Sequence, residues 1–259
     1  MTTVADILAF METVAPRSMK MDWDNVGLLC GSRNTQVTKI LVALDPFEHV
    51  CQEASDWGAE LIVTHHPLIF QALKSITDDT SIGRGIMTLI RSGISAVNAH
   101  TNLDCTPGGV NDILSKTLEL TNVEIINPQG DPAYGLLRCG EVTEQPLETF
   151  LSTVKASLGC EGLRYVDGGK PVRKVAVGGG SCAGEMMDAI GAGCDTFVTA
   201  DIKYNQFWDA KELGLNLIDA GHFYTENPVV AVLAEKIAAA FPEVEVKISE
   251  SHRDCMKFF

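Results

Sequence analysis

Residues 39–64 read KILVALDPFEHVCQEASDWGAELIVT, with a helical segment between two apolar runs. The first run is short and β-branched, and a turn separates it from the amphipathic segment. A glycine turn then leads into the second apolar run. This order of patterns predicts strand, helix and strand. Two strands joined by a crossover helix pair in parallel, so the stretch predicts a β-α-β unit.

The same pattern occurs again 135 residues later. Residues 174–199 read KVAVGGGSCAGEMMDAIGAGCDTFVT and align with the first stretch without a gap. Lys39 matches Lys174, and the acidic Glu60 matches Asp195. We therefore expect a structural duplication.

A further apolar run follows each copy, at residues 93–100 and 214–222. Aligning these two runs needs a different offset, about 121, so the connecting segments differ in length. The sequence predicts an α/β protein with two similar lobes, over residues 1–127 and 128–259. The turn-rich NPQGDP of residues 127–132 is the expected boundary between them.

Composition excludes several classes of protein. The chain has 259 residues and a formal net charge of −14, which makes it a poor general binder of nucleic acid. No apolar run is long enough to span a bilayer, and the first residues lack the pattern of a secretory signal. None of the eight cysteines forms a C-x-x-C pair. We therefore expect a cytoplasmic protein with reduced thiols and no membrane partner.

Side chains that can bind metal follow the predicted strands. Ligands of parallel α/β sheets bind at the carboxyl ends of the strands. The imidazoles and carboxylates found at those positions are His65, His66, His100, Asp104, His222 and Glu226. Imidazole and carboxylate without thiolate suit Zn²⁺, Fe²⁺ or Mn²⁺. We expect a metal site at the strand ends between the two lobes, where Glu226 could bridge two ions.

Two of these histidines are adjacent, in ELIVTHHP at residues 60–67. Consecutive side chains of an extended strand point to opposite faces, so both imidazoles cannot easily reach one ion. Pro67 confines His66 to an extended or turn conformation. We interpret His65 and His66 as ligands of two different ions.

Each candidate also has an ordinary structural interpretation. Asp104 could be a turn or helix-cap residue, and Glu226 a first-turn acid favoured by the helix dipole. His100 could be a ligand, a general base or a partner of a ligand, and we favour proton transfer. We interpret His49 and His252 as ordinary surface or core residues.

Two polar motifs have open interpretations. VGGGS at residues 177–181 could be a phosphate nest, in which backbone N–H groups converge on an anion, or a plain tight turn. Asp24 and Asn25 could lie near the site or only cap a turn. We favour the turn for that pair.

The ordered motifs resemble those of the Nif-three-like family, whose members are often labelled GTP cyclohydrolase 1 type 2 homologues. The motifs in this sequence are WDNVGL, THHPLIF, NAHTNLD, VGGGS, TADIKY and GHFYTE. The resemblance covers nearly the whole chain, in the short form without an inserted central domain.

The resemblance implies a dinuclear centre with two divalent transition-metal ions, Zn, Fe or Mn, per chain. The implied ligands are His65, His66, Asp104, His222 and Glu226, with Glu226 as the bridge. It also implies ring-shaped homohexamers. The sequence departs from the family at Ala200, where a glycine is common, and at Asn205, where a histidine is common.

The family label implies a hydrolase that acts on cyclic amidines and opens the imidazole ring of GTP. The products would be formate and a dihydroneopterin-triphosphate-type compound, with His100 transferring protons. One alternative is a dinuclear phosphoesterase that acts on a nucleotide or a phosphorylated metabolite. Another is a metal-binding protein without turnover that acts through protein interaction.

Overall fold

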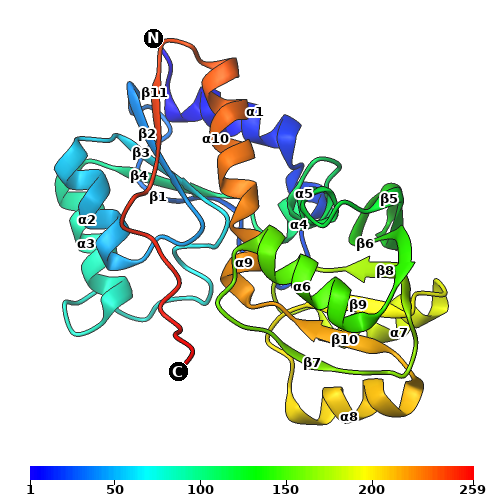
Figure 1. Cartoon of the computed structure of the whole chain (residues 1–259). Helices are drawn as coiled ribbons and strands as arrows, with labels where there is room; N and C mark the ends of the chain where they lie inside the picture. The colour runs from blue at the N-terminus through cyan, green and yellow to red at the C-terminus, as the bar shows by residue number, and fades with distance from the viewer. The chain divides into compact units, whose positions relative to one another are not determined.

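The computed structural model describes all 259 residues and divides into two compact units (Figure 1). The first unit comprises Met1–Leu103 and Val229–Asp254. The second comprises Asp104–Pro228 and Cys255–Phe259. Each unit is an α/β lobe with its own sheet, as the sequence predicts. No helix combines the length and the apolarity that crossing a membrane requires.

The sheet of the first unit has five strands in the order β1-β4-β3-β2-β11. Its strands are β1 (Gly27–Cys30), β2 (Lys39–Ala43), β3 (Leu61–Thr64), β4 (Ser95–Asn98) and β11 (Glu245–Ile248). Four of them are parallel, and only β1 runs antiparallel, beside β4. The helices of this unit are α1 (Val4–Val14), α2 (Glu48–Trp57), α3 (Ser81–Ser92) and most of α10 (Pro228–Ala240), with the 3-10 turn η1 (Arg17–Met19).

Strand β11, close to the end of the chain, belongs to the sheet of the first unit. Strand β11 lies beside β2 (Figure 1) and pairs with it in parallel. In this pairing Glu245 lies opposite Lys39. This pairing satisfies the backbone groups on the outer edge of β2, which would otherwise face solvent. For this reason the two units do not divide at a single point in the sequence.

The sheet of the second unit has six strands in the order β5-β6-β8-β9-β10-β7. Its strands are β5 (Thr121–Gln129), β6 (Asp131–Gln145), β7 (Arg164–Val166), β8 (Val172–Val177), β9 (Thr196–Thr199) and β10 (Asn216–Asp219). Strands β8, β9 and β10 are parallel, and the outer strands run antiparallel to their neighbours. The helical elements are α5 (Val110–Thr117), α6 (Leu147–Leu158), η2 (Ala183–Glu185), α7 (Met186–Gly191), α8 (Tyr204–Leu213) and α9 (His222–Glu226).

The turn-rich segment 127–132 connects two strands of one sheet. It forms the tight end of the β5–β6 hairpin, where Gly130 has φ +77°. The expected division between residues 127 and 128 therefore falls inside β5. Proline and glycine mark a hairpin here because a tight turn and a linker share the same composition.

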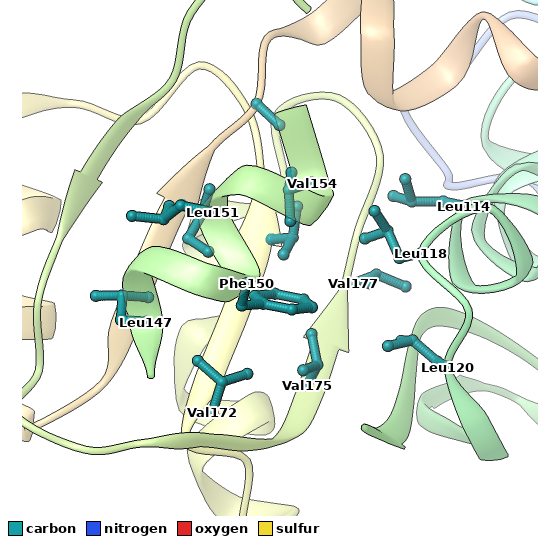
Figure 2. Close-up of a cluster of buried hydrophobic side chains, with 13 residues drawn as sticks. Leu114, Leu118, Leu120, Leu147, Phe150, Leu151, Val154, Val172, Val175 and Val177 are labelled. Atoms are coloured by element: carbon teal, nitrogen blue, oxygen red, sulfur yellow. The ribbon is translucent and has the colours of Figure 1, made fainter. Parts of the chain in front are cut away.

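A cluster of buried apolar side chains holds α6 against the second sheet (Figure 2). Helix α6 contributes Leu147, Phe150, Leu151 and Val154, and strand β8 contributes Val172, Val175 and Val177. Phe150 is fully buried at the centre of the cluster. Its truncation to alanine would cost about 3–5 kcal/mol of stability.

The duplication extends to individual hydrogen bonds. The Glu60 carboxylate accepts from the backbone N–H of Lys39 at 2.8 Å, and the Asp195 carboxylate accepts from that of Lys174 at 2.8 Å. Lys39 also donates through Nζ to the backbone carbonyl of Trp57. Lys174 donates in the same way to the carbonyl of Ala192, which is the matching position of the second copy. The predicted β-α-β repeat is confirmed, since both copies form a parallel strand pair.

Candidate metal centre

Three histidines of the first unit follow parallel strands that end at one edge of the sheet. His65 and His66 come directly after β3, and His100 comes two residues after β4. Asp45 comes two residues after β2. Because parallel strands present their carboxyl ends together, these four side chains gather at one place.

The chain turns at the pair of histidines. The N–H of His66 donates to the carbonyl of Leu44 at 2.9 Å, and the Thr64 hydroxyl donates to the carbonyl of His66 at 2.7 Å. The two imidazole centroids then lie 4.8 Å apart, with their planes inclined by 47°. Both rings therefore face the same region instead of opposite faces of a strand.

His100 completes this group. Its ring centroid lies 5.2 Å from that of His65 and 5.4 Å from that of His66. One ring nitrogen of each histidine lies within 4.8 Å of one ring nitrogen of each of the others. Three imidazoles at this spacing can present nitrogen ligands to metal ions.

The Nδ1 atom of every strand-end histidine is bound to an oxygen acceptor. His65 Nδ1 donates to the carbonyl of Ala99 at 2.9 Å. The other three histidines donate to carboxylates. His66 donates to Asp45 at 2.7 Å and His100 to Asp24 at 2.8 Å. His222 donates to Asp201 at 2.7 Å. An oxygen acceptor places the proton on Nδ1 and the lone pair on Nε2, which is the tautomer that binds metal.

Two of these carboxylates stay ionised although they are shielded from water. Burial opposes ionisation of Asp24, but hydrogen bonds from His100 and Thr101 outweigh it and lower its pKa to about 2. Burial likewise opposes ionisation of Asp45. Hydrogen bonds from His252 and His66 nevertheless hold its pKa well below the usual range.

The second unit has a histidine and a carboxylate on one short helix. Helix α9 begins at His222 and ends at Glu226, so the two side chains lie on one face. His222 Nε2 lies 3.0 Å from Oε2 of Glu226. Glu226 is almost fully buried, whereas the His222 side chain is about one-third exposed.

Asp104 lies beside Glu226 in the second unit. One carboxylate oxygen of Asp104 lies within 4.8 Å of one carboxylate oxygen of Glu226. Asp104 is at the end of α4 (Thr101–Cys105), and its carbonyl accepts from the buried side chain of Asn111 at 3.3 Å. Asn111 also accepts from the N–H of Gly179 at 2.7 Å and so ties Asp104 to the glycine run.

The glycine run forms a tight turn with all three glycine N–H groups engaged inside the protein. Gly178 donates to the carbonyl of Val198, Gly179 to Asn111, and Gly180 to the hydroxyl of Thr225. Gly180 has φ +64°, a conformation that favours glycine. The tight-turn interpretation therefore holds, since these amides do not converge on an anion.

The structure corrects one expectation about polar residues. We expected Asp24 only to cap a turn, but its carboxylate accepts from His100 Nδ1 at 2.8 Å and from the backbone N–H of Thr101 at 3.0 Å. Asp201, which the sequence did not single out, has φ +52° and accepts from His222. The feature common to Asp24, Asp45 and Asp201 is a position within three residues of one end of a strand.

The two departures from the family pattern lie around Asp201. Ala200 is fully buried, and its N–H donates to the carbonyl of Gly180 at 2.8 Å. Asn205 is exposed in the first turn of α8. Neither position belongs to a group of potential metal ligands.

The donor chemistry of these residues fits transition-metal ions. The groups of potential ligands contain only imidazoles and carboxylates, without cysteine. Imidazole nitrogen with carboxylate oxygen suits Zn²⁺, Fe²⁺ and Mn²⁺. The fixed Nδ1 protons add the supporting hydrogen bonds that metal-binding histidines usually have.

The fold and these groups define a protein of the NIF3 class. Residues 2–255 match the Duf34/NIF3 (NGG1p interacting factor 3) family, and the chain belongs to it. A relative from Clostridium perfringens, named GTP cyclohydrolase 1 type 2 homolog, is 40% identical over 98% of both chains.

Two solved structures are similar to this chain. Staphylococcus aureus protein SA1388 has a TM-score of 0.92 and 30% identity, with 100% of this chain and 99% of that chain covered. A Bacillus cereus protein related to NIF3 has a TM-score of 0.92 and 27% identity over the same shares of the two chains. The predicted family is confirmed.

Proposed function

We propose that this chain is a metal-dependent hydrolase with a dinuclear centre. Its proposed ligands are His65, His66, Asp104, His222 and Glu226. The observation that carries this proposal is the set of hydrogen bonds that fixes Nδ1 of each strand-end histidine on an oxygen atom. A histidine that binds metal through one ring nitrogen usually donates the other N–H to an oxygen acceptor, and all four histidines meet this condition through Nδ1.

Glu226 is the proposed bridge between two ions. One of its carboxylate oxygens lies 3.0 Å from His222, and Asp104 offers a carboxylate oxygen within 4.8 Å. The remaining ligands, His65 and His66, are proposed to hold one ion each. The ions would be Zn²⁺, Fe²⁺ or Mn²⁺, which share this ligand preference.

Ions of this kind polarise substrate oxygens and lower the pKa of water when they are bound. The residue proposed to move protons is His100. Its Nδ1 donates to the buried carboxylate of Asp24, which orients the ring and leaves Nε2 as the atom that would exchange protons. Asp24 in turn accepts from the hydroxyl of Thr101 at 2.5 Å, which fixes the orientation of the carboxylate.

The proposed reaction is opening of the GTP imidazole ring with release of formate. Support comes from the name of the Clostridium perfringens relative, GTP cyclohydrolase 1 type 2 homolog. In this reaction His100 would transfer protons between water and the purine. The alternative that needs the same residues is hydrolysis of a phosphoester in a nucleotide or phosphorylated metabolite.

The test is incubation of the metal-loaded protein with GTP, with formate and phosphate measured separately. Glu226→Ala, loaded in the same way, provides the blank. Formate above the blank would support ring opening, and phosphate alone would support a phosphoesterase. If the protein retains its metal but releases neither formate nor phosphate, turnover of GTP is contradicted. That result would favour the interaction role that the family description names.

The assembly and the cellular location belong to the same proposal. We propose a ring-shaped homohexamer, as the family resemblance implies, in the cytoplasm. All eight cysteines are free thiols, which agrees with a reducing compartment. Sedimentation equilibrium would measure the mass of the assembly, and a monomer at all concentrations would contradict the hexamer.

A further inference from the structure

His252 is connected to the candidate metal centre through Asp45. The side chain of His252 is almost fully buried, and its Nε2 lies 2.9 Å from Oδ2 of Asp45. The other oxygen of Asp45 accepts from Nδ1 of His66 at 2.7 Å. One carboxylate thus joins two imidazoles, of which one is a proposed ligand and the other lies near the end of the chain.

The segment that carries His252 is held in place by Glu53 on α2. The Glu53 carboxylate accepts from the hydroxyl of Ser249 at 2.5 Å and from the N–H of Glu250 at 2.9 Å. It also accepts from the N–H and the hydroxyl of Ser251, at 3.2 and 2.6 Å. These four hydrogen bonds fix the backbone immediately before His252.

Two aromatic side chains lie against the His252 ring. The ring centroids of Phe47 and His49 lie 5.6 and 6.0 Å from it. The packing limits the access of water to the contact with Asp45, and a hydrogen bond to a charged group is stronger where water is excluded. His49 belongs to this aromatic cluster but makes no hydrogen bond to Asp45, which makes it a matched control.

The comparison with His100 shows what His252 contributes. Both His66 and His100 donate through Nδ1 to one oxygen of an aspartate. In both cases the second oxygen of that carboxylate is hydrogen-bonded to another residue. For Asp24 the anchor is its neighbour in the fold, Thr101, which donates through its hydroxyl and its N–H. For Asp45 the anchor is His252, 207 residues further along the chain.

We propose that His252 is a positioning residue of the metal centre. It fixes the plane of the Asp45 carboxylate, and Asp45 in turn fixes the tautomer and ring orientation of His66. The inference rests on the proposed metal centre but not on any particular substrate. Loss of an outer partner of a ligating histidine typically lowers metal affinity about 10- to 100-fold.

The test measures metal affinity without reference to activity. Full-length protein is stripped with a chelator and titrated with Co²⁺, whose visible absorption reports the ligand geometry. The variants are His252→Ala, His252→Gln, Asp45→Asn and His49→Ala. Glutamine keeps an N–H donor near the position of Nε2, and thermal melts of the metal-free proteins check that each variant is folded.

We expect His252→Ala to lose about tenfold in Co²⁺ affinity and to change the absorption spectrum. His252→Gln should recover most of the loss, and His49→Ala should behave as the wild type. The double variant Asp45→Asn, His252→Ala should bind no more weakly than Asp45→Asn alone, because both changes break one chain of contacts.

Unchanged affinity and spectrum in folded His252→Ala would overturn the inference while leaving the metal centre intact. Strictly additive losses in the double variant would also overturn it, because His252 would then act independently of Asp45. Failure of the wild-type protein to bind Co²⁺ or Zn²⁺ would instead overturn the proposed function. The two failures are therefore distinguishable.

Discussion

A Cβ atom placed on Gly180 would lie 2.1 Å from Oε1 of Glu226, so the glycine leaves the space that this carboxylate occupies. The same Cβ would lie 3.1 Å from Nε2 of His222. The glycine run after β8 is thus part of the candidate metal centre through its lack of a side chain. It is not a site of its own, because its amides are already engaged.

Gly180→Ala should therefore weaken metal binding. Alanine would displace the Glu226 carboxylate and would also be strained at φ +64°. We expect at least a tenfold loss of metal affinity and about 1–3 kcal/mol of destabilisation. Both are measurable by metal titration and by denaturant unfolding of the metal-free protein.

The matched control is Gly184→Ala, in the 3-10 turn η2. A Cβ there would meet nothing within 4 Å. We expect unchanged metal affinity and equal or slightly higher stability, because alanine restricts the unfolded chain. Equal metal affinity in the two variants would contradict the role given to Gly180.

The metal content of purified protein should depend on the proposed ligands. After loading with Zn²⁺ or Mn²⁺, we expect about two ions per chain in the wild type. Glu226→Ala should lose both ions, because it removes the proposed bridge, whereas His65→Ala should lose about one. Elemental analysis after gel filtration measures this content.

The control for metal content is His49→Ala rather than a change at His252, because the structure connects His252 to Asp45. His49 is a surface-lying member of the aromatic cluster around Phe47. Its removal should leave the metal content unchanged. A loss in Glu226→Ala no larger than in His49→Ala would exclude Glu226 as a bridge.

Two exposed aromatic rings lie beside His100 and should contact a planar substrate. The Trp23 and Phe70 centroids lie 6.2 and 6.1 Å from that of His100 and 5.8 Å from each other. Both side chains are about half exposed or more. Base–aromatic stacking contributes about 1–3 kcal/mol, so Trp23→Ala should raise KM for a purine nucleotide about fivefold or more.

Steady-state kinetics with Trp208→Ala as the control would test this prediction. Trp208 is similarly exposed, on α8 of the second unit. We expect KM to change in Trp23→Ala only, with a smaller effect on kcat. A KM that is the same in both variants would contradict stacking at Trp23.

Stability should depend on pH through Glu53. Burial opposes its ionisation, but hydrogen bonds from Ser249, Ser251 and two backbone N–H groups lower its pKa from 4.5 to about 2. A lowered pKa in the folded state stabilises the protein above pH 4.5, and this contribution disappears as the pH falls towards 2. Glu53→Gln should therefore lose about 1–2 kcal/mol at pH 7.

Urea unfolding of Glu53→Gln at several pH values measures this contribution. The difference from the wild type should be constant above about pH 5 and should shrink between pH 4.5 and 2. Glu235→Gln, an exposed position on α10 without a hydrogen bond, should show no difference at any pH. A Glu53→Gln difference that persists at the lowest pH would contradict the assignment.

Sequence patterns predicted which side chains lie at the strand ends because the positions of strand ends follow from local periodicity. Strands β2, β3 and β4 are each marked by a short apolar run, and their parallel pairing follows from the helices between them. The positions of His65, His66 and His100 were therefore predictable. The pair His222 and Glu226 was predictable for a similar reason, since a spacing of four places both on one helix face.

The partners of the histidines were harder to predict, because they come from distant parts of the chain. Asp24 is 76 residues from His100, and His252 is 207 residues from Asp45. No local period connects residues at such separations. The same holds for the return of β11 to the edge of β2, which places residues 229–254 in the first unit.

The sequence by itself therefore determined the class of fold, the duplicated unit and the chemical type of the candidate ligands. Each of these depends on neighbours within a few residues, where backbone geometry relates spacing directly to position. Tertiary structure decided which oxygen holds each imidazole, why Gly180 must lack a side chain, and that His252 supports Asp45. Those relationships depend on hydrogen bonds and close contacts between distant segments, which form only when the chain has folded around them.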